Sequence, residues 1–228
     1  MADVRVFADE EELGAALAQE IVEIAPSLLG CPGGRSLVST YRALASSGAD
    51  LSGTTIVMMD EYVPVPRPTV HYGCRGFAQR EIAGPLGIPA ERVWLPDPQD
   101  PEAYDERIAA AGGIDVFLLA SGASDGHVAF LAPGSPLDGR TSVVRLAEST
   151  RRDNLATFPD FESVDEVPEH GVSVGLGTIA AARRLRLVLH GADKRGAAER
   201  LLALDGFDPE WPVSVVHEHP DARILVAT

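Results

Sequence analysis

One short stretch of the sequence, "ASGASDGHVAF", places a carboxylate and a histidine on either side of a glycine. Asp125 and His127 follow the apolar run "IDVFLLA", on a predicted turn whose glycines let a ligand approach the backbone. Histidine exchanges protons near neutral pH, and a neighbouring carboxylate orients the ring and favours its charged form. The stretch therefore predicts a proton-transfer pair, although an Asp-x-His spacing also occurs in turns with a purely structural role.

A second pair of carboxylates, Asp60 and Glu61, comes directly after the apolar run "TIVMM". Adjacent side chains at the end of a strand point in different directions, so only one of the two is expected to face a given pocket. Partial burial there raises the pKa of a carboxylic acid and suits it to proton transfer. The alternative from these residues alone is a solvated acidic pair or a helix cap.

Two further segments have the composition of an anion site. "GCPGGRS" leads into a predicted helix, so its backbone amides and the helix N-terminus favour a phosphate, and a lysine opens the helix after "LRLVL". The candidate phosphate-binding residues are Gly33, Gly34, Arg35, Ser36 and Lys194. The spacing of a Walker loop is absent, and an ordinary glycine turn with a solvated lysine is the alternative.

The elements that must position these residues alternate between short apolar runs and longer periodic segments. The predicted strands are "VRVFA", "TTIVMMD", "IDVFLLA", "VSVGLG", "LRLVLHG" and "ARILVAT". The first helical segment carries apolar residues at three- and four-residue steps, namely Leu13, Leu17, Ile21, Ile24 and Leu28. Strands that are apolar throughout indicate a mostly parallel sheet covered on both faces. We expect a three-layer, doubly wound α/β fold with its site beyond the carboxyl ends of the strands.

The domain organisation is predicted to be simple. We find neither a repeat nor a low-complexity linker, so residues 1–228 are expected to form one domain. The segment 150–171 has weak periodicity and many acidic residues. It is either a lid over the site or a plain solvated connection.

Charge and composition exclude several classes of function. The 34 acidic and 19 basic residues give a formal charge of −15, which opposes binding to nucleic acid or to anionic membranes. No run approaches the ~20 apolar residues of a membrane span, and the first residues lack the pattern of a secretion signal, so a cytoplasmic location is expected. Cys31 and Cys74 lack metal-ligand spacing and are expected to be reduced and packed.

In their order along the chain these segments resemble the superfamily of glucosamine-6-phosphate deaminases and 6-phosphogluconolactonases. The resemblance extends from about residue 28 to the end of the sequence. It rests on "MDEYVP", "DGHVAF", "GSPLDGRT", "VSVGLGTI", "GADK" and "HEHPDARILVA". "VGLGTI" is more typical of the deaminase branch, whereas "GGRS" is closer to the phosphate loop of the lactonases.

This resemblance implies a role for each candidate residue. Asp60 would remove the proton from C2 of the open-chain amino sugar, and His127 would open the pyranose ring while Asp125 holds the imidazole. Gly33, Gly34, Ser36 and Lys194 would bind the 6-phosphate. The implied reaction converts glucosamine 6-phosphate or galactosamine 6-phosphate to a ketose 6-phosphate and ammonia, without a metal or redox cofactor. The expected partner is the sugar phosphate alone, and a homo-oligomer is allowed.

Two positions depart from the deaminase pattern. Where deaminases usually continue as "AFNEP" this sequence has "AFLAP", so Ala132 replaces the glutamate that completes the relay to the histidine. Ala156 falls at the place of a lid arginine that contacts phosphate in many deaminases, and Arg151, Arg152 or Arg35 is expected to compensate. Two alternatives stay open: a sugar-phosphate lactonase, in which His127 activates water, and a sugar-phosphate sensor without catalysis.

Overall fold

A computed structural model describes residues 2–67 and 70–227, which are arranged around a seven-stranded sheet. All the strand pairs of this sheet are parallel, in the order β1-β10-β9-β6-β2-β3-β5. The strands are β1 Asp3–Phe7, β2 Leu28–Cys31, β3 Thr55–Met58, β5 Val93–Trp94, β6 Val116–Ala120, β9 Leu185–His190 and β10 Ala222–Ala227. The predicted parallel α/β architecture is therefore confirmed, while Met1 and Thr228, at the ends of the predicted domain, lie outside the described residues.

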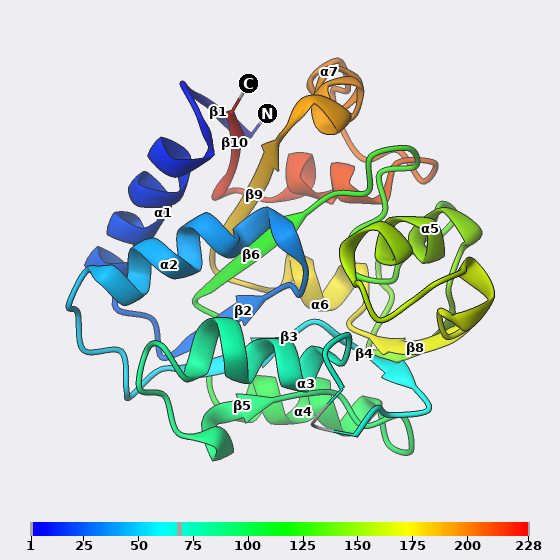
Figure 1. The fold of residues 1–228 in the computed structure, drawn as a ribbon. Coiled ribbons are helices and arrows are strands. Elements are labelled where there is room, and N and C mark those ends of the chain that lie inside the picture. The colour runs from blue at the N-terminus through cyan, green and yellow to red at the C-terminus, as the bar shows by residue number, and fades with distance from the viewer. Residues whose placement is uncertain (1, 68–69, 228) are drawn as a thin grey trace.

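Helices cover both faces of the sheet. The helices are α1 Glu10–Ile24, α2 Val38–Ser46, α3 Cys74–Phe77, α4 Glu102–Ala110, α5 Glu148–Thr157, α6 Leu176–Ala180 and α7 Arg195–Leu202. Shorter helical turns lie at Arg35–Leu37, Ala78–Ala83, Ala90–Arg92, Val164–Glu166, Ala192–Lys194 and Pro212–Glu218. One apolar core joins α1, α2 and the turn at 78–83 to the sheet, and a second joins α4, α6 and α7 to the sheet. Figure 1 shows α1 and α2 side by side, and the two termini together where β1 pairs with β10.

The first helix ends earlier than its apolar periodicity predicts. Asp9 caps α1 by accepting a hydrogen bond from the backbone N–H of Glu12, and the helix ends at Ile24, where Ala25 adopts the left-handed conformation. Pro26 follows and cannot continue the helix. Leu28, which fits the helical spacing, is therefore a buried residue of β2 instead.

The run "VSVGLG" was expected to be a strand of the main sheet, and this expectation is wrong. Only its first two residues belong to a strand, β8 His170–Ser173, which pairs antiparallel with β4 Asp60–Val63 and β7 Ser142–Arg145 in a separate sheet. The chain then turns at Gly175 into α6. Gly175 approaches the backbone of residues 139 and 140 so closely that a Cβ atom would overlap it.

The segment 150–171 is more regular than its sequence suggests. It contains most of α5, the helical turn at 164–166 and the start of β8, which lie together at the right of Figure 1. A small apolar cluster anchors it to the rest of the molecule. The cluster consists of Tyr62, Phe130, Leu146, Phe158, Phe161 and Val167. Aromatic packing, which short-range periodicity does not reveal, thus orders this region.

Two other sequence expectations concern single residues and membrane spans. Cys31 and Cys74 are both free and buried. Within the described parts of the chain, we find no helix of the length and apolar character that crossing a membrane requires.

Candidate active site

A cavity of about 720 Å³ opens where β2, β3, β6 and β9 end. Almost all of the residues singled out from the sequence line it. These are Gly33, Gly34, Arg35, Ser36, Asp60, His127 and Lys194. Among the candidate catalytic and phosphate-binding residues, Asp125 is the one outside this lining, and it contacts the cavity residue His127. Because these strands run in parallel, their carboxyl ends share one edge of the sheet, and residues far apart in the sequence meet there.

Asp60 is the buried acid of the cavity. The chain leaves β3 at Met58, and Asp60 opens β4, where it pairs with Ser173 of β8. Its side chain is 5% exposed, and Oδ1 accepts a hydrogen bond from the Cys74 thiol at 3.3 Å. Burial raises the pKa of Asp60 to about 7, with the Cys74 hydrogen bond opposing this and the Glu61 charge adding to it. A carboxyl with this pKa can both take up and release a proton near neutral pH.

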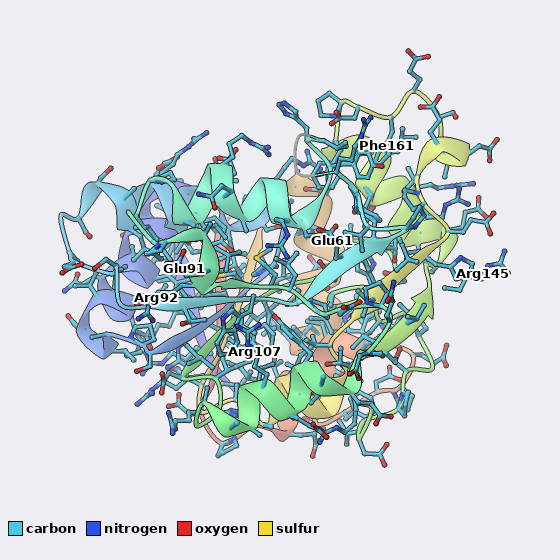
Figure 2. The ribbon with its side chains drawn as sticks, turned by 90° about the horizontal axis from the view of Figure 1, so that it is seen from below. Glu61, Glu91, Arg92, Arg107, Arg145 and Phe161 are labelled. Carbon is cyan, nitrogen blue, oxygen red and sulfur yellow. The ribbon has the colours of Figure 1, made fainter. Side chains whose placement is uncertain are left out.

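Glu61 has a different task from its neighbour. It accepts hydrogen bonds from the backbone N–H groups of Tyr62 and Cys74, each at 2.9 Å, and of Arg75 at 3.0 Å. Figure 2 shows Glu61 between β4 and the helix that begins at Cys74. Glu61 therefore satisfies free amides at the start of α3 and does not line the cavity.

His127 and Asp125 form a hydrogen-bonded pair. Asp125 Oδ1 lies 2.8 Å from His127 Nδ1 and also accepts from the His127 backbone N–H at 3.1 Å. The hydroxyl of Ser149, on α5, donates to the other oxygen of Asp125. Burial alone would raise the pKa of Asp125, but the His127 contacts and the Ser149 hydrogen bond together hold it well below its usual range. The ionised carboxylate thus fixes the imidazole by Nδ1 and leaves Nε2 for a ligand.

Two glycines allow this pair to form. A Cβ on Gly122 would lie 2.2 Å from His127 Nδ1 and 2.5 Å from Asp125 Oδ1. Gly126 has a φ of 64°, which glycine adopts without strain, and its Cα packs against the ring of Trp211. The turn therefore requires glycine at both places, for close approach at Gly122 and for backbone conformation at Gly126.

Part of the cavity lining is cationic. The loop 33–36 and Lys194 face it, and the Lys194 ammonium donates to the Ser121 carbonyl oxygen at 2.6 Å. Burial lowers the pKa of Lys194, while the nearby carboxylates of Asp153 and Asp193 favour its charged form. His190 steadies the loop, because its Nε2 lies 3.0 Å from the Ser36 carbonyl oxygen and its Nδ1 lies 2.9 Å from Glu10.

The three arginines expected to compensate for the lid arginine differ in whether they line the cavity. Arg151 donates to the carbonyl oxygens of Val164 and Val167, and Arg152 pairs with Glu148 on the surface. Neither lines the cavity, whereas Arg35 does. Arg35 is therefore the member of the three that is placed to meet a bound anion.

Ala132, which the resemblance places where deaminases usually have a glutamate, is not among the residues that line the cavity. It lines a second hollow of about 620 Å³, together with Arg145, Arg151 and Glu148. The second oxygen of Asp125 instead accepts from Ser149. Helix α5 thus supplies a contact to the pair that the DGH motif does not contain.

The sequence analysis missed two residues that touch the candidate catalytic carboxylates, Cys74 and Ser149. Cys74 is 14 residues from Asp60, and Ser149 is 24 residues from Asp125. No spacing rule joins them to the motifs, since they arrive on separate helices. Across the described ranges, no group of three or more His, Cys, Asp or Glu side chains is placed to hold a metal ion.

Comparison with protein families supports an origin shared with sugar-phosphate enzymes. The family model described as glucosamine-6-phosphate isomerases/6-phosphogluconolactonase matches residues 8–225. A glucosamine-6-phosphate deaminase of Rhodococcus jostii (strain RHA1) is 37% identical over 227 residues, covering 93% of this chain and 83% of the relative. The glucosamine-6-phosphate deaminase of Shouchella clausii (strain KSM-K16) is 32% identical over 233 residues, covering 97% and 92%.

Solved structures of both a deaminase and a lactonase are similar to this chain. A monomeric glucosamine-6-phosphate deaminase superposes with a TM-score of 0.91 at 26% identity, covering 99% of this chain and 97% of that one. The 6-phosphogluconolactonase from Trypanosoma cruzi superposes with a TM-score of 0.74 at 19% identity, covering 99% and 94%. The second likeness concerns the fold, whereas the first extends to the sequence.

Proposed function

Because the chain belongs to the family of glucosamine-6-phosphate isomerases and 6-phosphogluconolactonases, we propose that it is an amino-sugar-phosphate deaminase. Its substrate is glucosamine 6-phosphate or galactosamine 6-phosphate, and its products are a ketose 6-phosphate and ammonia. The observation that carries the proposal is the buried Asp60, whose pKa of about 7 suits it to a base, in one cavity with His127 and Lys194.

The cationic residues and the acid–base residues of the cavity have separate tasks in this reaction. Lys194, Arg35 and the amides of the loop 33–36 hold the 6-phosphate. Nε2 of His127 moves the proton that opens the pyranose ring, and ionised Asp125 stabilises the imidazolium as it forms. Asp125 remains a carboxylate throughout, since its pKa is held well below its usual range.

Asp60 then acts on the open chain. Its carboxylate takes the proton from C2, and the electron pair forms a C1–C2 double bond while the C1–O double bond breaks and O1 takes up a proton. The nitrogen lone pair then forms a double bond to C2, C1 takes up a proton, and the nitrogen releases one. The resulting imine at C2 adds water and expels ammonia, which leaves the ketose. The sum is one amino-sugar phosphate and one water converted to one ketose phosphate and one ammonia, so no oxidant or reductant is consumed.

The segment 150–171 is proposed to act as a lid. Several residues of α5 line the cavity, so movement of this helix would open or close access to it. The proposal includes a cytoplasmic location and allows a homo-oligomer. It includes no nucleic-acid partner, because the formal charge of −15 opposes binding to nucleic acid.

A lactonase is the second candidate, favoured by the lactonase-like "GGRS" loop. The same His127 would then activate water for attack on an ester carbonyl. That chemistry has no task for a base at C2, and relatives with 32% and 37% identity are deaminases. The deaminase therefore accounts for more of the residues that line the cavity.

A substrate panel tests the proposal. Wild-type protein is offered glucosamine 6-phosphate, galactosamine 6-phosphate, unphosphorylated glucosamine and 6-phosphogluconolactone. Ammonia, ketose and lactone hydrolysis are measured. We expect ammonia and ketose in equal amounts from an amino-sugar phosphate, and no release from the unphosphorylated sugar. If the protein hydrolyses the lactone and releases no ammonia from either amino-sugar phosphate, the deaminase proposal is wrong and the lactonase proposal takes its place.

A further inference from the structure

Helix α5 turns a polar stripe toward the cavity. Thr150, Asp153, Asn154 and Thr157 all line it, and all four lie on one face of the helix because they are spaced by three or four residues. The stripe, defined by these four residues, forms a wall made of a helix, whereas the candidate catalytic residues follow strands. A carboxylate, a carboxamide and two hydroxyls thus face the same space.

Three polar atoms of the stripe are buried but not hydrogen-bonded. Thr150 is 1% exposed, and Thr150 Oγ1, Asp153 Oδ2 and Asn154 Nδ2 are all buried atoms. For these three atoms the described residues offer no hydrogen-bond partner. Thr157 differs, because its hydroxyl donates to the Asp153 carbonyl oxygen at 2.8 Å.

The other polar residues of α5 are satisfied within the protein. Arg151 donates to two carbonyl oxygens of the segment 164–167, Ser149 donates to Asp125, and Arg152 pairs with Glu148. The contacts of Arg151 and Ser149 hold the helix in place without help from the stripe. A buried polar atom without a partner costs stability, so three of them on residues that line one cavity point to groups that serve a ligand.

The chemistry of the stripe selects the ligand. Asn154 Nδ2 donates, Asp153 Oδ2 accepts and the Thr150 hydroxyl does both, which matches the neighbouring hydroxyls of a sugar carbon chain. A phosphate would suit the stripe poorly, because it brings acceptors and negative charge to Asp153. The field of Asp153 already reaches Lys194, where it favours the charged ammonium.

We propose that the α5 stripe is a binding subsite for the hydroxyl groups of a phosphorylated polyol or sugar chain, with the phosphate held by Lys194 and Arg35. This deepens the proposed function by assigning sugar recognition to Thr150, Asp153 and Asn154. It depends on that function only for the class of ligand. Binding through the stripe requires neither ring opening nor deamination.

The test compares two probes that share a phosphate. A hexitol 6-phosphate carries the carbon chain, inorganic phosphate does not, and neither can be deaminated, so calorimetry gives a Kd for each. Thr150→Val keeps the shape of the side chain and removes its hydroxyl. We expect it to weaken hexitol phosphate binding about three- to tenfold, to leave inorganic phosphate within about twofold, and to leave the ligand-free melting temperature unchanged or higher.

Thr40→Val is the matched control. Thr40, on α2, also has a fully buried hydroxyl for which no partner lies in the described ranges, but it does not line the cavity. The same substitution there should change neither Kd. Asn154→Leu gives a second measurement on the stripe and should again weaken the hexitol phosphate selectively.

The outcomes separate this inference from the proposed function. If Thr150→Val and Asn154→Leu bind the hexitol phosphate as tightly as wild type, or if they lose both probes equally, the subsite is wrong. Selective loss of the hexitol phosphate upholds the subsite even when no ammonia is released from any amino sugar. Ammonia release with unchanged probe binding in both variants upholds the function and overturns the subsite.

Discussion

The two walls of the cavity differ in how their polar groups are held. On the wall formed by strand ends, Asp60 is bonded to Cys74, His127 to Asp125 and Lys194 to the Ser121 carbonyl. On the α5 wall, Thr150, Asp153 and Asn154 have buried atoms without a protein partner among the described residues. The two groups proposed to move protons, Asp60 and His127, are thus fixed in advance, as catalysis requires. Groups that recognise the sugar are left for the sugar to complete.

The strand-end wall also contains two carboxylates with opposite properties. Asp60 is buried beside a weak thiol donor and has a pKa raised to about 7. Asp125 accepts from an imidazole, a backbone N–H and a hydroxyl, and its pKa is held well below its usual range. Environments that separate two pKa values in this way support the proposal that Asp60 is the base and that Asp125 keeps its charge.

The largest effect is expected from removing the base on the strand-end wall. Asp60→Asn keeps the shape of the side chain but cannot accept the C2 proton, so kcat should fall about a hundredfold or more with little change in ligand affinity. Steady-state kinetics on the amino-sugar phosphate measure this. Wild-type turnover in the variant would remove Asp60 from the mechanism.

Glu61→Gln is the control for that experiment. Glu61 holds backbone amides and does not line the cavity, so its variant should lose about 1–3 kcal/mol of the free energy of unfolding while kcat falls far less than in Asp60→Asn. A larger catalytic loss in Glu61→Gln than in Asp60→Asn would reverse the two assignments.

The next effect should come from the cationic end of the same wall. Lys194→Ala removes one charge-assisted contact to the phosphate, worth about 1.5–3 kcal/mol, which raises KM about 10- to 150-fold. Inorganic phosphate binding should weaken as well, unlike in the stripe variants. An unchanged KM together with unchanged phosphate affinity would place the phosphate elsewhere.

A smaller effect is expected where the two walls meet. Ser149→Ala removes the α5 hydroxyl that donates to Asp125, so the imidazole is held less firmly and kcat should fall about fivefold, corresponding to about 1 kcal/mol. KM should change little, in contrast to variants of the stripe. Arg152→Ala, on the exposed side of α5, is the control and should match wild type. A fall in affinity without a fall in kcat would make Ser149 a binding residue.

The smallest effect concerns the acid limb of the pH profile. The Cys74 hydrogen bond stabilises the ionised form of Asp60, so Cys74→Ala should raise the pKa of Asp60 above about 7. Since only the carboxylate is a base, the acid limb of kcat/KM moves to higher pH. Cys74→Ser retains a hydrogen-bond donor, so the acid limb of this variant should lie close to that of wild type. If the acid limb of Cys74→Ala does not move, the limb does not report the ionisation of Asp60.

The residues of the strand-end wall could be predicted from the sequence, whereas those of the α5 wall could not. Asp60, His127 and Lys194 each follow an apolar run, and parallel strands bring their carboxyl ends to one edge, so local pattern was enough to predict that they meet. Cys74, Ser149 and the stripe belong to helices whose positions depend on tertiary packing. Local periodicity carries no information about those positions.

The errors in the predicted secondary structure also arise because local periodicity does not reveal tertiary packing. Leu28 continues a helical spacing, yet Pro26 ends the helix and the residue lies in β2. The run "VSVGLG" is apolar enough for the main sheet, yet β8 pairs with β4 and β7 because the chain leaves β3 at Met58 and forms a second sheet from Asp60 onward. Pairing between distant strands decided that outcome.

The most direct test of the central claim follows the C2 proton. Wild type and Asp60→Asn are given glucosamine 6-phosphate with deuterium at C2, and loss of the label is measured by NMR alongside ammonia release. The account predicts that wild type loses the deuterium in step with ammonia and that the variant does neither at a comparable rate. Loss of the deuterium by Asp60→Asn at the wild-type rate would contradict it.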